Sequence, residues 1–151
     1  MAVKKIRDGF STLTPYIVVD GAEKAIEFYE KAFGAELVDK SMGPDGKIMN
    51  AQLKFGNCML MLNDEFPDYG SVGPKKIGGS PVTIHLSVED VDAVWKRAID
   101  AGVEVTMELQ DMFWGDRYGS FTDPFGHKWS MATHIADPTP EEMEKAMAAF
   151  M

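Results

Sequence analysis

The sequence predicts an α+β fold made of two tandem βαβββ modules followed by a C-terminal helix. The chief observation is an internal repeat, since residues 16–37 and 85–105 share one order of features: a short apolar strand, an acidic residue, an amphipathic helix, a glycine and a second apolar run. Gly34 matches Gly102 at an offset of 68 residues, which exceeds the period of about 20–50 residues typical of solenoids. The repeat therefore predicts one domain over residues 1–151, with a ligand cleft between two modules.

The first module is predicted over residues 12–63. Its first strand, residues 13–19, is rich in β-branched side chains. The following helix, residues 21–33, has apolar side chains at helical spacing, and Asp20 with Glu23 is typical of a capping box at its start. Turns with glycine and asparagine separate the next strands, which are predicted over residues 36–42, 47–55 and 58–63.

Residues 64–81 contain many glycines and prolines and show no periodicity, which predicts a linker between the modules. At about 18 residues this linker is long enough to be a functional flap. The second module, residues 82–134, repeats the plan with a helix over residues 90–101 and a type I turn at residues 123–126. Its strands are predicted over residues 82–88, 103–109, 116–122 and 127–134.

A further helix is predicted over residues 139–150. Thr139 provides an N-cap, and Pro140 stands at the first helical position, where its missing N–H costs nothing. Its stripe of methionine and phenylalanine side chains predicts packing, either on the same chain or on a sister subunit. A groove for foreign ligands is the alternative.

The composition favours a cytoplasmic protein that binds neither nucleic acid nor membranes. The formal net charge of −9 opposes binding to a phosphate backbone or to anionic lipids. No apolar run reaches the roughly 20 residues that a membrane helix needs, and the first ten residues lack the apolar stretch of a secretory signal. Cys58 is the only cysteine in the sequence and lies in an apolar run, so it is predicted to be buried rather than a reactive thiol.

The chain resembles the vicinal oxygen chelate superfamily, and in particular its PhnB-like branch, in three runs of sequence: PYIVVDGAEKAIEFYEKAFGAE (15–36), IHLSVEDVDAVW (84–95) and FWGDRYGSFTDPFGHKWSMATH (113–134). This superfamily includes glyoxalase I, bleomycin-resistance proteins and extradiol dioxygenases. The resemblance covers about residues 12–134. It implies curved mixed sheets with helices on their convex faces, a ligand cleft on the concave side, and a homodimer.

The resemblance also assigns four positions to the metal ligands of the catalytic members, on the first and last strands of each module. In this sequence those positions hold Thr14, Leu60, Thr83 and Ser130. Divalent sites of this kind need imidazole, carboxylate or thiolate donors. The usual metal is therefore expected to be absent, and no cofactor is predicted.

Polar side chains remain on the faces predicted to line the cleft. Alternation along residues 82–88 places His85 on the face away from the helix. His85 is the candidate catalytic base, although an inward-facing histidine is more often a satisfied structural residue. The residues predicted to bind a ligand are Tyr16, Thr83, His85, Trp114, Ser130 and His134.

Three more side chains have open roles. Trp114 stands at the entrance of a strand, where it either stacks on a planar ligand or fills the edge of the core or of the dimer contact. Arg117 is expected to pair with Asp116 or to clamp an anion, and the alternation leaves open which face of the strand it occupies. His127 lies in a turn and is expected to be exposed.

Two functions are compatible with these observations. The first is a dimeric, metal-free protein of the glyoxalase/bleomycin-resistance type that sequesters a toxic or antibiotic small molecule in an aromatic, acidic cleft. The second is a lyase or isomerase acting on a small carbonyl substrate, with a displaced divalent metal or His85 as the base. The sequence contains no nucleophile elbow, P-loop or dinucleotide fingerprint that would point to other chemistry.

Overall fold

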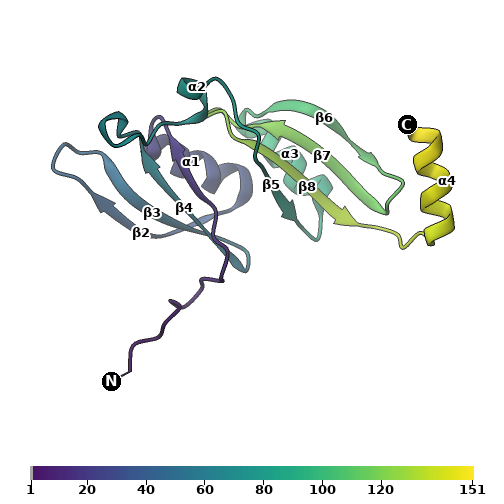
Figure 1. The fold of residues 1–151 in the computed structure, drawn as a ribbon, viewed down its shortest axis with the longest axis horizontal. Helices are drawn as coiled ribbons and strands as arrows, with labels where there is room; N and C mark the ends of the chain where they lie inside the picture. Colours follow the sequence, from purple (N-terminus) through teal and green to yellow (C-terminus); the bar gives the residue numbers. More distant parts are fainter. Residues whose placement is uncertain (1) are drawn as a thin grey trace. The chain divides into compact units, whose positions relative to one another are not determined.

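The computed structural model describes residues 2–151 and has the α+β fold that the sequence predicts. Its strands form two separate four-stranded sheets (Figure 1). The chain divides into two compact units, which are described separately below. The first unit contains the residues up to Pro81 together with Phe125–His127, and the second contains Val82–Pro124 and Lys128–Met151.

The first unit is a mixed sheet with one helix against it. The strand order is β1-β4-β3-β2, in which β1 is parallel to β4 and the other neighbours are antiparallel. The elements are β1 (Tyr16–Val19), α1 (Ala22–Phe33), β2 (Glu36–Met42), β3 (Ile48–Phe55), β4 (Cys58–Asp64), the short 3-10 helix η1 (Pro67–Tyr69) and α2 (Pro74–Ile77).

The second unit repeats this plan and adds a terminal helix. Its strand order is β5-β8-β7-β6, again with one parallel pair, β5 and β8, and two antiparallel pairs. The shared order and directions confirm two tandem modules. The elements are β5 (Thr83–Ser87), α3 (Val91–Ala101), β6 (Glu104–Asp111), β7 (Asp116–Thr122), β8 (Lys128–His134) and α4 (Pro140–Phe150).

Aromatic packing joins α1 to the first sheet. Tyr29 is fully buried and stacks on Phe33, with ring centroids 5.9 Å apart. Its ring also lies 6.1 Å from that of Phe55 on β3, and the helix-facing side chains Leu53 and Leu62 are fully buried. Burying such side chains contributes about 1.5–3 kcal/mol each, so this face of the sheet is the core of the unit.

The corresponding core of the second unit is built around Trp95 of α3. Its ring packs edge-on against Phe121 of β7 at 5.9 Å. It also lies directly over Gly119, where a Cβ atom would come within 2.6 Å of the indole ring. Because residues two apart on a strand share a face, Arg117 lies on this helix-facing side of β7 and not on the open side.

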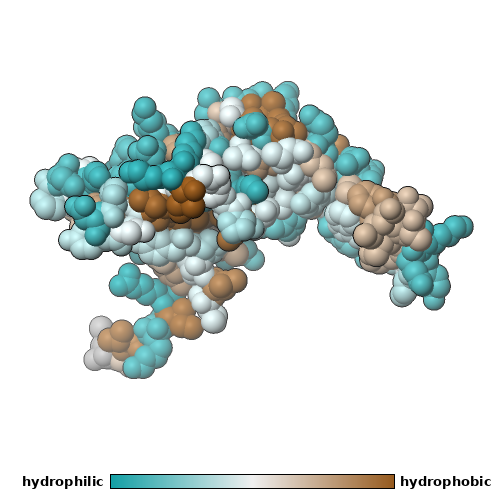
Figure 2. All heavy atoms as spheres, turned by 45° about the horizontal axis from the view of Figure 1, so that its top comes forward, coloured by the Kyte–Doolittle hydropathy of each residue, from teal (hydrophilic) through white to brown (hydrophobic). Residues whose placement is uncertain are grey.

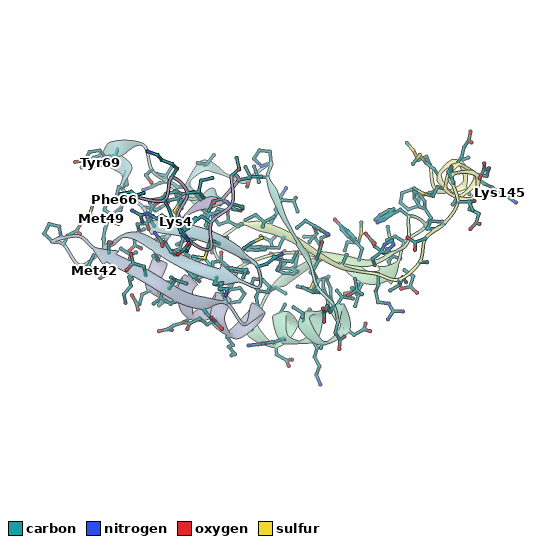
Figure 3. The ribbon with its side chains drawn as sticks, turned by 90° about the horizontal axis from the view of Figure 1, so that it is seen from below. Lys4, Met42, Met49, Phe66, Tyr69 and Lys145 are labelled. Carbon is teal, nitrogen blue, oxygen red and sulfur yellow. The ribbon has the colours of Figure 1, made fainter. Side chains whose placement is uncertain are left out.

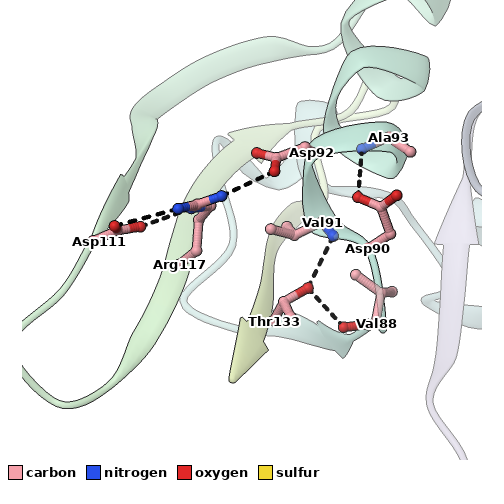
Figure 4. A network of polar contacts seen from close by, with 8 residues as sticks. All are labelled: Val88, Asp90, Val91, Asp92, Ala93, Asp111, Arg117 and Thr133. Carbon is pink, nitrogen blue, oxygen red and sulfur yellow. Dashed lines mark hydrogen bonds and ion pairs between the residues drawn. The ribbon is translucent and has the colours of Figure 1, made fainter. Parts of the chain in front are cut away.

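Arg117 therefore pairs with residues on the helix side of the sheet (Figure 4). Its Nε donates to Asp111 on β6 at 2.7 Å, and its Nη1 donates to Asp92 on α3 at 2.9 Å. The expected pairing with Asp116 is wrong, because Asp116 is one residue away on the strand and points to the opposite face. The hydrogen bond from Arg117 lowers the pKa of the Asp111 carboxyl below its ordinary value.

The predicted capping box at α1 is also wrong. The residue at the N-cap is Gly21, and the first helical N–H, that of Ala22, donates to Asp64 Oδ1 at 2.7 Å. In the second unit Val91 N likewise donates to Thr133 Oγ1 at 2.8 Å, and the N-cap residue Asp90 accepts a further bond from Ala93 N at 3.2 Å (Figure 4). Thr133 and Val91 each lie 69 positions after Asp64 and Ala22. The last strand of each unit therefore caps the helix of that unit.

Two single-residue expectations need correction. Cys58 is exposed, not buried, because it is the first residue of β4 after a turn, and the burial begins at Met59. His127 is half-buried, not exposed, and its Nε2 is hydrogen-bonded to the carbonyl oxygen of Val18 at 2.7 Å. The turn that carries His127 packs with the first unit, which the sequence pattern did not indicate.

Two further segments complete the fold. Residues 64–81, predicted as a linker, contain the last residue of β4 and two short helical turns. The N-cap of α4 is Thr139 as predicted, since its side chain accepts from Glu142 N at 3.1 Å. Figure 2 shows an apolar surface, in tan, at the end of the second unit that carries α4. Among residues 2–151, no helix has the length and apolar character needed to cross a membrane.

Candidate ligand-binding site

The open face of the second sheet carries most of the predicted site residues. Alternation on β5 exposes Thr83, His85 and Ser87, while Ile84 and Leu86 between them are less exposed. The imidazole of His85 stacks on the ring of Tyr118, with centroids 5.9 Å apart and planes 17° apart. Since Tyr118 and Gly119 are neighbours on β7, this contact places His85 on the side opposite to α3.

A hydrogen bond to Ser130 fixes the orientation of His85. Its Nδ1 lies 2.7 Å from Ser130 Oγ, on the neighbouring strand β8. Ser130 is only 2% exposed, so its hydroxyl is occupied by this contact and does not reach solvent. Within the described residues, Nε2 of His85 has no hydrogen-bond partner, which leaves it available to a ligand.

Asp116 connects the other two predicted residues. Its Oδ2 accepts from Trp114 Nε1 at 3.1 Å, and its Oδ1 lies 2.9 Å from Nδ1 of His134. The other nitrogen of His134 lies 2.6 Å from Oδ1 of Asp137. The hydrogen bonds to Asp137 and then to Asp116 raise the pKa of His134 above its ordinary value, because both carboxylates favour the imidazolium form.

Four aromatic rings continue from His85 along this face toward α4. Trp114 packs edge-on against Tyr118 at 5.8 Å, and Phe113 packs edge-on against Trp114 at 5.1 Å. The row ends at α4, where the ring of Phe150 lies 5.6 Å from that of Phe113. Trp114 is half-buried, so part of its indole remains accessible to a planar ligand.

A pocket of about 310 Å³ opens beside this row. Its lining contains two carboxylates, Glu89 and Asp116, and the imidazoles of His85 and His134, so the pocket has an acidic side. Its volume is at the lower end of the roughly 300–1,000 Å³ usual for small-molecule sites. The residues that line it are His85, Ser87, Val88, Glu89, Asp116, Ala132 and His134.

The structure brings some predicted residues together and leaves others apart. His85 and His134 line one pocket. Ser130 is hydrogen-bonded to His85, and Trp114 is hydrogen-bonded to Asp116, which also lines the pocket. Thr83 lies at the exposed start of β5 and does not line the pocket. Tyr16 lies in the first unit, where it lines a different pocket.

Sequence reasoning missed Tyr118, Asp116 and Asp137. Alternation already grouped Asp116 with Tyr118, but the face of β7 was undetermined. The signal that decides it is Gly119, which is the one residue on β7 small enough to lie under Trp95. Asp137 lies after the last strand, where no alternation of side chains could indicate that it contacts the site.

The four positions that the resemblance assigns to metal ligands do not fit a divalent ion. Leu60 is a buried apolar side chain, and the Ser130 hydroxyl is held by His85. Thr14 and Thr83 offer only neutral hydroxyl groups. Across residues 2–151, no cluster of three or more histidine, cysteine, aspartate or glutamate side chains is arranged to hold a metal ion.

Comparison with known proteins gives consistent matches over most of the chain. Residues 10–131 match the family model described as Glyoxalase/Bleomycin resistance protein/Dioxygenase superfamily. The chain is 46% identical over 140 residues to the uncharacterized protein Mb0911c of Mycobacterium bovis, which covers 91% of this chain and 92% of that protein.

Solved structures with the same fold come from several bacteria. TnmS3, an antibiotic binding protein from Streptomyces sp. CB03234, is similar with a TM-score of 0.62 and 25% identity, over 89% of this chain and 98% of TnmS3. The PhnB protein from Bacillus cereus has a TM-score of 0.62 and 18% identity, over 82% of this chain and 99% of its own. The second likeness concerns the fold alone.

Proposed function

Because the chain belongs to the glyoxalase/bleomycin resistance protein/dioxygenase superfamily, we propose that it is a small-molecule binding protein of the bleomycin-resistance type. It sequesters a toxic or antibiotic molecule on the open face of the second sheet, without the superfamily's usual metal. The similarity to TnmS3, named an antibiotic binding protein, supports binding over catalysis. Fold alone does not fix the chemistry in such families, so the proposal rests on the site.

The observation that carries this proposal is the pairing of an aromatic row with a small acidic pocket. Trp114 and Tyr118 offer rings for stacking on a planar ligand. Nε2 of His85, held in place by Ser130, offers one directed hydrogen bond. Glu89 and Asp116 add negative charge at the same pocket, which favours a ligand with a basic group.

The test uses Trp114 as a reporter of binding. Planar aromatic antibiotics are first screened for binding by native mass spectrometry. We expect those that bind to change the tryptophan fluorescence of the protein. This change should vanish in Trp114→Phe, because the other two tryptophans, Trp95 and Trp129, are buried in the core. His85→Gln should weaken the Kd about tenfold through loss of one oriented hydrogen bond. His127→Gln is the matched control, since His127 is bonded to Val18 in the first unit, and its Kd should match the wild type.

A purely structural His85 would give a different result. His85→Gln would then lower the melting temperature while leaving the Kd unchanged. That outcome, or a fluorescence change that survives in Trp114→Phe, would contradict the proposed site.

One observation favours an enzyme as the second candidate. An imidazole held at Nδ1 with its Nε2 open is the arrangement of an oriented general base. His85 would then remove a proton from carbon next to the carbonyl of a small substrate, as in a lyase or isomerase. The same variant separates the two candidates: His85→Gln in an enzyme would lower kcat while the substrate Kd stays near the wild-type value.

We further propose a homodimer in the cytoplasm. The edge strand β2 is exposed along its whole length, including Val38 at 56%, and none of the residues of α4 is buried. Exposed sheet edges and apolar helices are normally covered by a partner, and a second copy would cover both. The exposed thiol of Cys58 is most stable in a reducing compartment.

The dimer is tested by sedimentation equilibrium at micromolar concentration. We expect a species of twice the 16.7 kDa chain mass. Dilution should shift the equilibrium toward the monomer, as mass action requires. A species of 16.7 kDa throughout would refute the dimer and leave the site on the second sheet unaffected.

A further inference from the structure

The first unit has a pocket of its own, with a volume of about 550 Å³. It lies between the β2–β3 turn and the segment after β4. Figure 3 shows the side chains of Met42, Met49, Phe66 and Tyr69 gathered at this end of the unit. The residues that line the pocket are Tyr16, Gly43, Pro44, Asp45, Met49, Asn63, Phe66, Tyr69 and Ser71.

The wall formed by residues 66–71 is held rigidly in place. Phe66 and Ser71 exchange backbone hydrogen bonds of 2.7 and 3.2 Å, which closes the segment into a small hairpin. Lys47, in the turn between β2 and β3, contacts this hairpin, because its Nζ donates to the carbonyl oxygen of Glu65 at 3.0 Å and lies 5.3 Å from the Phe66 ring centroid. A ligand would therefore meet a wall that is already formed, which lowers the entropic cost of binding.

The pocket presents an unused acceptor from a buried side chain. Asn63 is 6% exposed, and its Nδ2 donates to the Asp64 carbonyl oxygen at 2.6 Å and to Ser71 Oγ at 3.1 Å. The carbonyl of Asp64 can only accept, so it fixes the orientation of the amide. Within residues 2–151 the Oδ1 of Asn63 has no partner, and no fully buried side-chain oxygen is left unpaired. This Oδ1 is thus open to the pocket that Asn63 lines.

Asp45 adds a carboxylate to the pocket, and Met49, Phe66 and the ring of Tyr69 supply apolar surface. Asp45 stands at the rim with one oxygen held by Lys47 N at 3.1 Å, which leaves Oδ2 free. Tyr69 is 88% exposed, and among the described residues its ring packs against no other ring. An exposed aromatic side chain beside Met49 and Phe66 offers a surface for a ring of the ligand.

We propose that this pocket is a second small-molecule site, which binds an aromatic compound bearing a primary amine. The ring packs between Tyr69, Phe66 and Met49. The ammonium group donates to Asn63 Oδ1 and is neutralised by Asp45, both of which are acceptors. An anionic compound of the same size would be repelled by the Asp45 carboxylate, and the lining side chains would offer it only the neutral hydroxyls of Tyr16, Tyr69 and Ser71. The site uses no residue of the second unit, so it is independent of the function proposed above.

Three matched compounds test the site by isothermal titration of the full-length protein: 2-phenylethylamine, phenylacetate and 2-phenylethanol. We expect phenylethylamine to bind at least tenfold more tightly than phenylacetate, with phenylethanol between them. Asp45→Asn keeps the bond to Lys47 N but removes the charge, so it should weaken phenylethylamine five- to tenfold and leave phenylethanol unchanged. Tyr69→Ala should weaken all three compounds by a similar factor.

The controls separate this site from general electrostatics and from the second unit. Asp68→Asn removes an exposed carboxylate that does not line the pocket, and it should leave all three affinities unchanged. His85→Gln should also leave them unchanged. No saturable binding of phenylethylamine, equal binding of the three compounds, or equal effects of Asp45→Asn and Asp68→Asn would each overturn the proposal.

Discussion

Replacing Gly115 with alanine is expected to lower the free energy of unfolding by about 3 kcal/mol. Gly115 has φ +105°, a backbone conformation that costs an alanine about 1–3 kcal/mol. A Cβ atom there would also overlap the carbonyl oxygen of Ala136 and lie 3.0 Å from the Pro138 ring. Gly115 lies in the turn between β6 and β7, which packs against the segment where the chain leaves β8 for α4.

The substitution should also loosen the start of the C-terminal segment. The carbonyl oxygen of Gly115 accepts from Ile135 N at 2.8 Å and from Ala136 N at 3.1 Å. We expect amide exchange at Ile135 and Ala136 to rise well above the exchange of the β7–β8 core, because the loop must shift to admit the methyl group.

Gly46→Ala provides the matched control for the backbone effect. Gly46 also has a positive φ, of 80°, but no atom lies within 4 Å of the position that a Cβ would take there. Gly46→Ala should lower the free energy of unfolding by only about 1 kcal/mol, because it has the backbone cost without a steric clash. Urea unfolding of both variants measures the difference. If Gly115→Ala is no more destabilised than Gly46→Ala, the close approach of Ala136 is not what requires glycine.

Asp64→Ala should lower the free energy of unfolding by about 2–3 kcal/mol. Its two oxygens accept from Ala22 N at 2.7 Å and from Ile48 N at 2.8 Å. Removing the carboxylate leaves both N–H groups without a partner at the junction of α1, β3 and β4, where the cost of an unsatisfied donor is about 1–3 kcal/mol.

The second unit suggests the control for this prediction. Thr133 serves the equivalent helix with one hydroxyl. Asp64→Thr should therefore keep a bond to Ala22 N and leave only Ile48 N unpaired. Its free energy of unfolding should fall by about half as much as that of Asp64→Ala. Urea unfolding followed by circular dichroism decides the order. Equal losses in the two variants would show that Asp64 does not act as the cap of α1.

The internal repeat made the topology predictable, because the same order of strand and helix patterns occurs in the sequence of each unit. The caps of α1 could not be predicted from local pattern, since Asp64 lies 42 positions from Ala22 and meets it only through the parallel pairing of β1 and β4. Asp20 and Glu23 match a local capping motif, but the N-cap residue is Gly21, which has no side chain, and Asp64 accepts the first helical N–H instead.

The candidate site was predictable in part for a related reason. Alternation placed His85 on the open face, because its apolar neighbours must face α3. For β7 the alternation gave two equal choices, and only the contact of Trp95 with Gly119 decides between them. That tertiary contact places Tyr118 and Asp116 on the open face, where the candidate site lies. The pocket of the first unit depends on how residues 66–71 fold back, for which the segment carries no periodic signal.

The placement of the Phe125–His127 turn has a consequence for synthesis of the chain. Phe125 packs on Phe28 and Tyr29 of α1 at 6.1 and 6.2 Å, and His127 is bonded to Val18 of β1. The core of the first unit therefore contains side chains that the ribosome adds more than 40 residues after Pro81. A fragment ending at Pro81 would leave the Phe28 edge of this core open to solvent. During translation the core of the N-terminal unit therefore stays incomplete, with that apolar edge exposed, until most of the C-terminal unit has been synthesised.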